Sequence, residues 1–333
     1  MEISKIRLAE IFNSEFETTN FGIPIEKVLP EDILLENFWD IKNVIQFEKT
    51  KNPINKLFKQ LTKNRYKDYG QFHHFKKFEF ALNIIKNRSV QVSSLFSNDA
   101  NDFAEYTELF KRLGMFHPLL SKDFQKKAWE NNIDPNDETP SDSDRRHIFV
   151  MCFTQDNHNE KFWKNYANND HGVAIGFRIS DYQEEARKLY DFRDVFYDTG
   201  YSFDFFNAIN YKIRKEFNKI IFAEGLIMFS KFYKRAKYNW ENETRLCFHY
   251  DDPKIPGIPT SKFLETHFPI QEAAGIDRTF IELPLEGTEK ENPLFKISIT
   301  EVACGKFVSA DEFMELKQAL SVSYPTAFIW QRQ

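Results

Sequence analysis

Two blocks of this sequence place polar side chains inside stretches whose flanks are typical of buried strands. The first block runs from Cys152 to Phe177 and the second from Lys237 to Phe248. A polar group in such a place lowers stability unless it is paired, so it is often there for a reason other than packing. The two blocks therefore constrain the fold, which has to bring polar groups onto a sheet, and they are where we expect function.

Short apolar runs, some of them alternating with polar residues, predict a sheet of short strands. The expected strands are residues 72–75, 90–95, 147–154, 173–177, 246–249, 280–285 and 295–305. Helices are expected at residues 78–86, 202–237 and 311–320. A further helix, capped by Asp156 or Asn157, is expected to carry Trp163 and Tyr166 on one face.

The order of these elements favours an α+β fold, with an irregular mixed or antiparallel sheet and helices inserted between its strands. Strands and helices do not alternate regularly, and the chain holds only 11 glycines, so a Rossmann or P-loop architecture is disfavoured. The 36 phenylalanines are expected to fill core positions rather than to line a binding surface.

The length of 333 residues allows about two domains. Residues 1–68 are expected to form a partly helical N-terminal leader. Residues 69–310 are expected to form a domain of catalytic type with a helical insertion at about 200–237, followed by a C-terminal helix and tail at 311–333.

Charge and hydropathy restrict the partners. The net charge is −5, and the 45 basic and 50 acidic residues are evenly mixed, so there is no broad basic field for duplex nucleic acid. The longest apolar run, around residues 220–229, contains Glu224 and is too short to span a bilayer. Three isolated cysteines suit a reducing compartment. The sequence therefore predicts a cytoplasmic protein with no membrane partner.

Glu241, Glu243 and Arg245 stand at alternate positions at the start of an expected strand, so they are expected to project from one face. Two carboxylates about 7 Å apart beside a guanidinium fit acid/base chemistry or the stabilisation of an oxocarbenium ion. A structural Glu/Arg pair on the exposed face of an edge strand explains the same pattern and stays open.

Histidines and aromatic residues near the two blocks have two interpretations each. His73 and His74 close an expected strand, where a histidine is usually a hydrogen-bonded neutral imidazole. No histidine or cysteine spacing is typical of a metal site, and no metal is expected. Trp163 and Tyr166, three residues apart on a helix, form either part of a core or a ligand platform.

Six motifs follow one another from about residue 70 to about residue 305. They are a short opening strand and helix, an N-D-x-x-E loop, a C-F-S-like strand end, a W-x-x-Y-A helix, a G-V-x-x-x-F strand and a closing E-x-E-x-R stretch. The last five fall at residues 101–105, 152–154, 163–167, 172–177 and 241–245. In this order they resemble a bacterial family called domain of unknown function 2971, related to the AbiGi abortive-infection proteins. Thr154 replaces the usual Ser, and Tyr238 stands where the family generally has Trp.

The motif order of that family is similar to the plan of ADP-ribosyltransferases. This plan has a strand with His or Arg, a strand ending in Ser or Thr before an aromatic helix, and a late strand with a catalytic Glu. The resemblance implies that Glu243 is the catalytic carboxylate, that Glu241 assists on the acceptor side and that Thr154 orients Glu243. Arg245 would bind a phosphate or lock Glu241.

The same resemblance implies that NAD is a substrate. Trp163 or Tyr166 would pack on its nicotinamide ring, and His74 would hold its adenosine ribose. Cleavage of NAD passes through an oxocarbenium-like state, which a nearby carboxylate stabilises.

The leading hypothesis is therefore an NAD-dependent ADP-ribosyltransferase or NAD glycohydrolase that acts as a toxin-like antiphage effector. Its acceptor would be a macromolecule, protein or nucleic acid, and a phage protein or an antitoxin is a possible partner. Two alternatives stay open. One is a metal-dependent nuclease that uses Asp99, Asp102, Glu241 and Glu243 with a histidine; the other is a noncatalytic sensor of a nucleotide or a phage protein.

Overall fold

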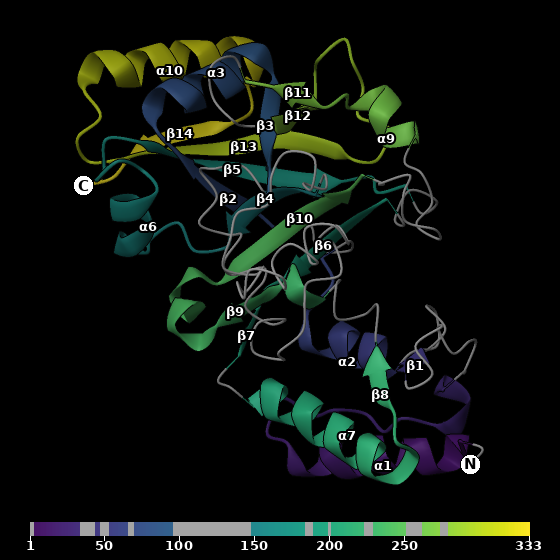
Figure 1. Cartoon of the computed structure of the whole chain (residues 1–333). Helices are drawn as coiled ribbons and strands as arrows, with labels where there is room; N and C mark the ends of the chain where they lie inside the picture. Colours follow the sequence, from purple (N-terminus) through teal and green to yellow (C-terminus); the bar gives the residue numbers. More distant parts are fainter. Residues whose placement is uncertain are drawn as a thin grey trace, which may run out of the picture. The chain divides into compact units, whose positions relative to one another are not determined.

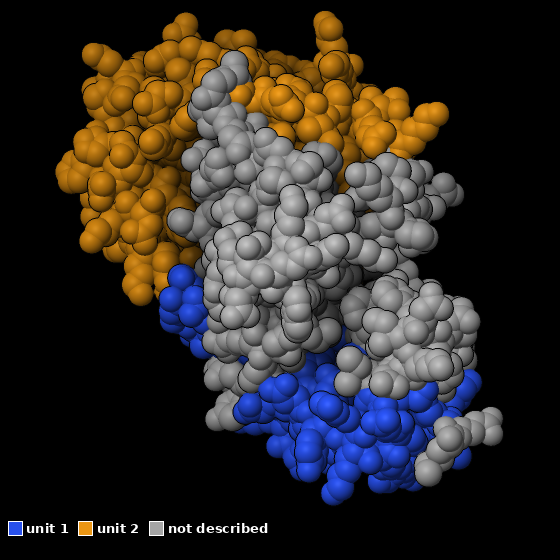
Figure 2. All heavy atoms as spheres, in the orientation of Figure 1, with its two compact units in different colours: residues 1–63, 101–145, 195–239 blue, residues 64–100, 146–194, 240–333 orange. Residues whose placement is uncertain are grey.

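The computed structural model describes residues 3–33, 44–46, 53–65, 70–95, 148–183, 189–198, 201–222, 229–250, 262–273 and 279–333. The chain forms two compact units (Figures 1 and 2). Unit 1 comprises residues 1–63, 101–145 and 195–239, and unit 2 comprises residues 64–100, 146–194 and 240–333. Each unit is thus assembled from separate segments of the chain.

Unit 2 is built on a ten-stranded sheet, which confirms the predicted α+β class with an irregular, mostly antiparallel sheet. The strands are β2 (Phe72–Lys76), β3 (Ser89–Ser94), β4 (Ile148–Thr154), β5 (Val173–Ser180), β6 (Tyr190–Asp194), β10 (Glu243–His249), β11 (Gln271–Glu272), β12 (Thr279–Pro284), β13 (Lys296–Cys304) and β14 (Phe328–Gln331). The main path runs β11-β12-β3-β4-β2-β5-β13-β14, and β10 lies between β4 and β6. Within this sheet β13 and β14 are parallel and the other pairs are antiparallel.

Strand β4 is the branch point of the sheet. One of its edges pairs with β10 along its whole length. The first part of β4, at Phe149 and Val150, pairs with β3, whereas its last residue, Thr154, pairs with His73 of β2. The sheet therefore divides beyond β4, and Thr154 lies between β2 on one side and β10 on the other.

The two faces of the sheet have different cores because side chains alternate along each strand. One face packs against α3 (Phe78–Asn87), α9 (Lys262–His267) and α10 (Ala310–Ser323), in a core that includes Phe72, Phe153 and Ile175. The opposite face carries a smaller aromatic cluster formed with α6 (Glu160–Asn165).

Side chains cap the starts of two helices in unit 2, and one of these caps differs from the prediction. Helix α10 begins at a capping box, in which the Ser309 hydroxyl accepts from the Glu312 amide at 3.2 Å. Helix α6 is capped by Asn159, whose side chain accepts from the Lys161 amide, and not by Asp156 or Asn157 as predicted. Asn157 is instead hydrogen-bonded to a histidine of the sheet.

Unit 1 joins the N-terminal leader to the insertion that follows β6. Its elements are α1 (Lys5–Thr18), η1 (Pro30–Asp32), β1 (Val44–Gln46), α2 (Pro53–Leu61), β7 (Phe196–Asp198), α7 (Tyr201–Phe217), β8 (Ile220–Phe222) and β9 (Tyr233–Arg235). Strand β1 pairs in parallel with β8, and β7 pairs in parallel with β9. Because β8 and β9 fall between residues 202 and 237, the insertion is not helical over the whole of that predicted range.

The core of unit 1 is largely aromatic, which agrees with the prediction that phenylalanine serves packing. Phe16 of α1 stacks on Phe205 of α7, with ring centroids 4.7 Å apart and an interplanar angle of 7°. Phe12 and Phe21 also contact Phe205. Leader and insertion thus share one core in this unit.

Residues 311–333 belong to unit 2, since α10 packs on its core and β14 pairs with β13. The three cysteines, all in described strands, form no disulfide. Among the helices that the structure describes, none is long and apolar enough to cross a membrane. The predicted loops at 97–105 and 131–146 lie outside the described residues.

Replacing Phe205 by Ala should destabilise unit 1 by about 3–5 kcal/mol, because Phe205 is fully buried and its removal leaves a large cavity. Tyr211→Ala is the matched control, since Tyr211 lies on the same helix and is 68% exposed. Urea unfolding and hydrogen exchange of the α1 and α7 amides measure the effect. Equal stabilities of the two variants would contradict this account of the core.

Candidate functional site

A row of residues paired directly across five neighbouring strands of unit 2 forms the candidate site. Glu243 of β10 pairs with Thr154 of β4, and Thr154 pairs with His73 of β2. His73 pairs with Gly176 of β5, and Gly176 pairs with Glu301 of β13. Directly paired residues have their side chains on the same face of a sheet, so the four side chains of this row point to one side. The row is on the face opposite the main core.

A β-bulge in β13 sets the orientation of Glu301. Ile299 and Val302 both belong to the main core although they are three residues apart, because the pairing with β5 shifts between Ile299 and Glu301. The extra residue, Thr300, donates its hydroxyl to the Gly176 carbonyl at 3.3 Å. Regular alternation from Ile299 would place Thr300 on the face of the row and Glu301 in the main core. Because of the bulge, Glu301 faces the row instead.

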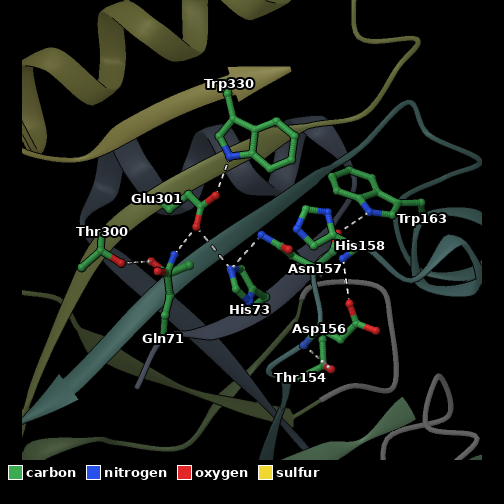
Figure 3. A network of polar contacts seen from close by, with 11 residues as sticks. Gln71, His73, Thr154, Asp156, Asn157, His158, Trp163, Thr300, Glu301 and Trp330 are labelled. Carbon is green, nitrogen blue, oxygen red and sulfur yellow. Dashed lines mark hydrogen bonds and ion pairs between the residues drawn. The ribbon is translucent and has the colours of Figure 1, made fainter. Parts of the chain in front are cut away.

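Glu301 and His73 meet across the strand that separates them (Figure 3). His73 Nε2 lies 3.4 Å from Glu301 Oε2, and the side chain of Asn157 lies 3.2 Å from the same nitrogen. The carboxylate of Glu301 also accepts hydrogen bonds from the side chains of Gln71 and Trp330. Two donors, one directly before β2 and one on β14, thus converge on the carboxylate that lies beside His73.

The pKa of His73 is lowered from its ordinary value, mainly because burial disfavours the imidazolium ion. The nearby Glu301 carboxylate and the Thr154 backbone carbonyl oppose this effect, and His158 adds to it. His73 is only 5% exposed. Burial therefore disfavours the charged form of the His73 ring, and the Glu301 carboxylate offsets part of this effect.

Gly176 makes the contact between Glu301 and His73 possible. A Cβ at this position would collide with the Gln71 side-chain amide and lie 3.1 Å from the Glu301 Cβ. Since Gly176 stands between His73 and Glu301 in the row, its missing side chain leaves the space that the Gln71 amide fills.

Glu243 and Arg245 form a buried ion pair on β10. Arg245 Nε is 2.7 Å from Glu243 Oε1, and Arg245 Nη2 is 3.3 Å from Glu243 Oε2. The guanidinium therefore contacts both carboxylate oxygens. Arg245 is fully buried and Glu243 is 6% exposed. The prediction that these two residues share a face of a strand is confirmed, and the role of that pair stays a prediction.

Glu241 does not share that strand face, contrary to the prediction. It is the last residue of the 3-10 helix η4 (Ala236–Glu241), and β10 begins only at Glu243. Asn242 between them has a φ of 40°, in the left-handed region that breaks the strand geometry. Glu241 instead accepts a hydrogen bond of 3.0 Å from the Tyr166 hydroxyl.

Trp163 and Tyr166 occupy different environments. Trp163 is fully buried, donates its indole N–H to the Asn157 carbonyl at 2.7 Å and packs edge-on against Phe75. Tyr166 is 47% exposed. Trp163 is therefore part of the aromatic cluster under α6, and Tyr166 is the one of the two with a ring surface to offer a ligand.

Thr154 ends β4 and starts the turn that leads to α6. Its hydroxyl accepts from the Asp156 amide at 3.1 Å, and the Asp156 carboxylate accepts from the His158 amide at 2.9 Å (Figure 3). The threonine predicted to orient Glu243 is thus its direct neighbour in the row, and its hydroxyl also stabilises the turn.

His74 lies on the opposite face from Thr154 and Glu243. Its Nδ1 is 2.7 Å from the Cys152 carbonyl, so this nitrogen carries the proton that is donated. Part of the residue is accessible, but Nε2 is buried and has no hydrogen-bond partner among the described residues. Burial lowers the pKa of His74 to about 3. The histidine that shares a face with Thr154 and Glu243 is His73.

Sequence reasoning missed His73 as the site histidine, and it missed Glu301, Gln71, Asn157 and Trp330. Phe72 is a core residue, and side chains alternate along a strand, so His73 is expected on the face opposite the core. The sequence therefore contained the information that places His73 on the face of the site. The position of Glu301 could not be predicted, because it depends on a β-bulge that has no recognisable sequence pattern here.

Within the residues that the structure describes, no three His, Cys, Asp or Glu side chains are grouped so that they could share a metal ion. Asp99 and Asp102, two residues of the nuclease hypothesis, lie outside the described residues.

Comparison with protein families identifies part of the chain. Residues 162–246 match the model of the family described as "Protein of unknown function (DUF2971)". The match confirms the predicted resemblance to this family over about a quarter of the chain, including the C-terminal part of α6, all of β5 and the segment from Glu241 to Arg245. Comparisons with curated proteins and with solved structures give no match.

Acid should destabilise the protein partly through His74. Above a pH of about 6.5 this histidine is neutral in both the folded and the unfolded chain, so it contributes no pH dependence. As the pH falls from about 6.5 toward 3, only the unfolded chain takes up the proton, and stability falls by about 1.4 kcal/mol per pH unit.

His74→Asn keeps a donor for the Cys152 carbonyl and should remove this slope in urea unfolding between pH 4 and 7. The control is His267→Asn, since His267 is an exposed histidine on α9. An unchanged slope in His74→Asn would show that the ring of His74 is not held neutral.

Gly176→Ala should destabilise unit 2 by about 1–3 kcal/mol, because the added methyl group overpacks the row. Combining it with Gln71→Ala should recover part of this loss, since the Gln71 amide is the nearest obstacle. A double-mutant cycle of unfolding free energies measures the coupling, and strict additivity would contradict the proposed crowding.

Proposed function

We propose that this protein is an NAD-consuming ADP-ribosyltransferase that modifies a macromolecule. The observation that supports this most directly is the row formed by His73, Thr154 and Glu243 on the adjacent strands β2, β4 and β10. The transferase plan uses a strand with His, a strand ending in Ser or Thr before an aromatic helix, and a late strand with Glu. Here those three residues are direct neighbours on one face, in that order.

The reaction calls for a fixed negative charge beside the ribose. The bond between the ribose C1′ and the nicotinamide nitrogen breaks, and its electron pair leaves with nicotinamide. Positive charge develops at C1′ and the ring oxygen until a nucleophile of the acceptor bonds to C1′ and releases a proton. The carboxylate of Glu243, which pairs with the Arg245 guanidinium, fits the stabilisation of this charge.

The other residues fit roles around that carboxylate. Tyr166 has an exposed ring for nicotinamide, and its hydroxyl is hydrogen-bonded to Glu241. The Tyr166–Glu241 contact links the aromatic residue to the segment that carries Glu243, so Glu241 is suited to position both Tyr166 and an incoming acceptor. His73, in place of His74, is suited to hold a ribose hydroxyl.

The resemblance to the AbiGi abortive-infection proteins extends the proposal to the cellular role. We assign the protein as a toxin-like antiphage effector of the cytoplasm whose transferase activity arrests an infected cell. A phage protein or an antitoxin would then control it.

Nicotinamide release from NAD, measured by chromatography with and without cell lysate, tests the reaction. Glu243→Gln should reduce release by at least about 100-fold, as expected when a group that stabilises transition-state charge is removed. Glu243→Asp keeps the charge that pairs with Arg245 but withdraws the carboxylate, and it should lose activity while remaining folded. Thermal unfolding of both variants separates loss of chemistry from loss of structure.

Two results would contradict the proposal. If folded Glu243→Asp and Glu243→Gln release nicotinamide as fast as the wild type, the Glu243–Arg245 pair is structural only. If the wild type, with lysate present, neither releases nicotinamide nor binds NAD, the transferase proposal fails.

A further inference from the structure

Helix α6, at whose end Tyr166 lies, cannot hold its position by itself. It has six residues, and an isolated helix of that length is not stable in water. The turn that follows it places Asn168, Asn169 and Asp170 in the left-handed region, with φ of 51°, 53° and 64°. This region is unfavourable for residues other than glycine, although Asn and Asp tolerate it best. The position of α6 therefore depends on its contacts with the rest of unit 2.

Arg332, which follows β14 near the C-terminus, provides such contacts along the whole of α6 (Figure 1). Its Nη2 donates to Glu160 in the first turn of the helix at 2.5 Å, and its Nη1 donates to Asp170 in the following turn at 2.5 Å. The guanidinium carbon lies over the Trp163 ring, 4.7 Å from the ring centroid. The backbone amide of Arg332 donates to the Cys304 carbonyl at 3.0 Å. A residue tied to β13 thus contacts the start and the middle of α6 and the turn after it.

The burial of these groups indicates which contact holds α6 most firmly. The side chains of Arg332 and Asp170 are 9% and 14% exposed, whereas that of Glu160 is 68% exposed. An exposed ion pair is screened by water and contributes little, while a buried pair destabilises strongly when one partner is removed. Asp170 is therefore the main anchor of Arg332, and Glu160 is the weaker one.

A second side of α6 contacts the segment that leads into β10. Asn159 donates its side-chain amide to the Trp240 carbonyl at 3.0 Å, and the centroids of the Phe162 and Trp240 rings are 5.2 Å apart. The Tyr166 hydroxyl donates to Glu241 at 3.0 Å. Asn159, Phe162 and Tyr166 are spaced at i, i+3 and i+7, so they lie along one side of the helix. A shift of α6 would consequently move Tyr166 relative to Glu241 and Trp240.

We propose that Arg332 is a positioning residue that holds α6 in place, so that the ring of Tyr166 stays beside Glu241 and is ready to stack on nicotinamide. The use of Tyr166 by NAD rests on the proposed function. The dependence of α6 on Arg332 is independent of it. Lysine is a poor substitute for Arg332, because its compact ammonium lacks the planar fork that contacts two carboxylates and stacks on an aromatic ring.

Arg332→Lys is the test variant because it keeps the positive charge and loses the planar group. Arg178→Lys is the matched control, since Arg178 is exposed and lies on β5 of the same unit. The reporter is the indole N–H signal of Trp240 in NMR without NAD, assigned through Trp240→Phe. This signal should shift in Arg332→Lys and not in the control, because Trp240 packs on Phe162 of α6. The Trp163 signal should shift as well, since Arg332 lies over that ring.

Asp170→Asn and Glu160→Gln test the two anchors separately. Asn also tolerates the left-handed backbone conformation of Asp170, so this variant removes the charge and keeps the turn. The Trp240 signal should shift more in Asp170→Asn than in Glu160→Gln, because Glu160 is the more exposed anchor. Thermal unfolding establishes that each variant is folded before the signals are compared. An unmoved Trp240 signal in both variants would overturn the proposal.

Steady-state kinetics with NAD measures the effect on the site. Arg332→Lys should raise KM on the order of tenfold with a smaller change in kcat, since a misplacement of about 1 Å that starts far from the reacting atoms costs up to about 100-fold. In a Tyr166→Ala background Arg332→Lys should no longer raise KM, because the ring that it positions is absent. A residue that only stabilises the fold would have the same effect in both backgrounds.

The outcomes separate the two proposals. If the wild type consumes NAD and Arg332→Lys matches Arg178→Lys in KM or in the Trp240 signal, the role of Arg332 is refuted and the transferase stands. If the wild type does not consume NAD, the transferase fails and the NMR comparison decides on Arg332. An unchanged Trp240 signal in Arg332→Lys would then overturn its positioning role, and the expected shift would support it.

Discussion

The strand pairing around β4 is the constraint on which the site depends. Because β4 pairs with β10 on one edge and ends beside β2 on the other, residues that are far apart in sequence become direct neighbours. Burial of the opposite face under α3, α9 and α10 fixes this register, since a slip by one residue would exchange core and site side chains. The polar row is thus a consequence of where the apolar residues have to go.

The sequence predicts the architecture well where hydrophobic patterning is strong. Strands such as β4 and β5, and helix α10 with its capping box, lie close to their expected positions because burial and local capping agree there. The hydrophobic pattern does not predict the direction of a side chain where a single backbone conformation determines it. Asn242 separates Glu241 from the strand of Glu243, and the bulge at Thr300 turns Glu301 toward the row. Neither conformation follows from residue type alone.

The two histidines of β2 show how small the difference between a site residue and a core residue is. His73 and His74 are adjacent, yet one contacts Glu301 and Asn157 and the other donates to the Cys152 carbonyl on the opposite face. The burial that lowers the pKa of both therefore has different consequences. In His74 it keeps the ring neutral, and in His73 it is partly offset by the Glu301 carboxylate on the face of the row.

Because the residues of the row are far apart in the sequence, they are synthesised at different times. Glu301 is the last residue of the row to be made, more than two hundred positions after His73, and Trp330 follows later still. At a synthesis rate of roughly 5–20 residues per second, a nascent chain spends on the order of ten seconds or more with β2 made but β13 absent. The row of side chains can therefore be completed only after β13 has been made, and the contact of Glu301 with Trp330 only after β14 has followed.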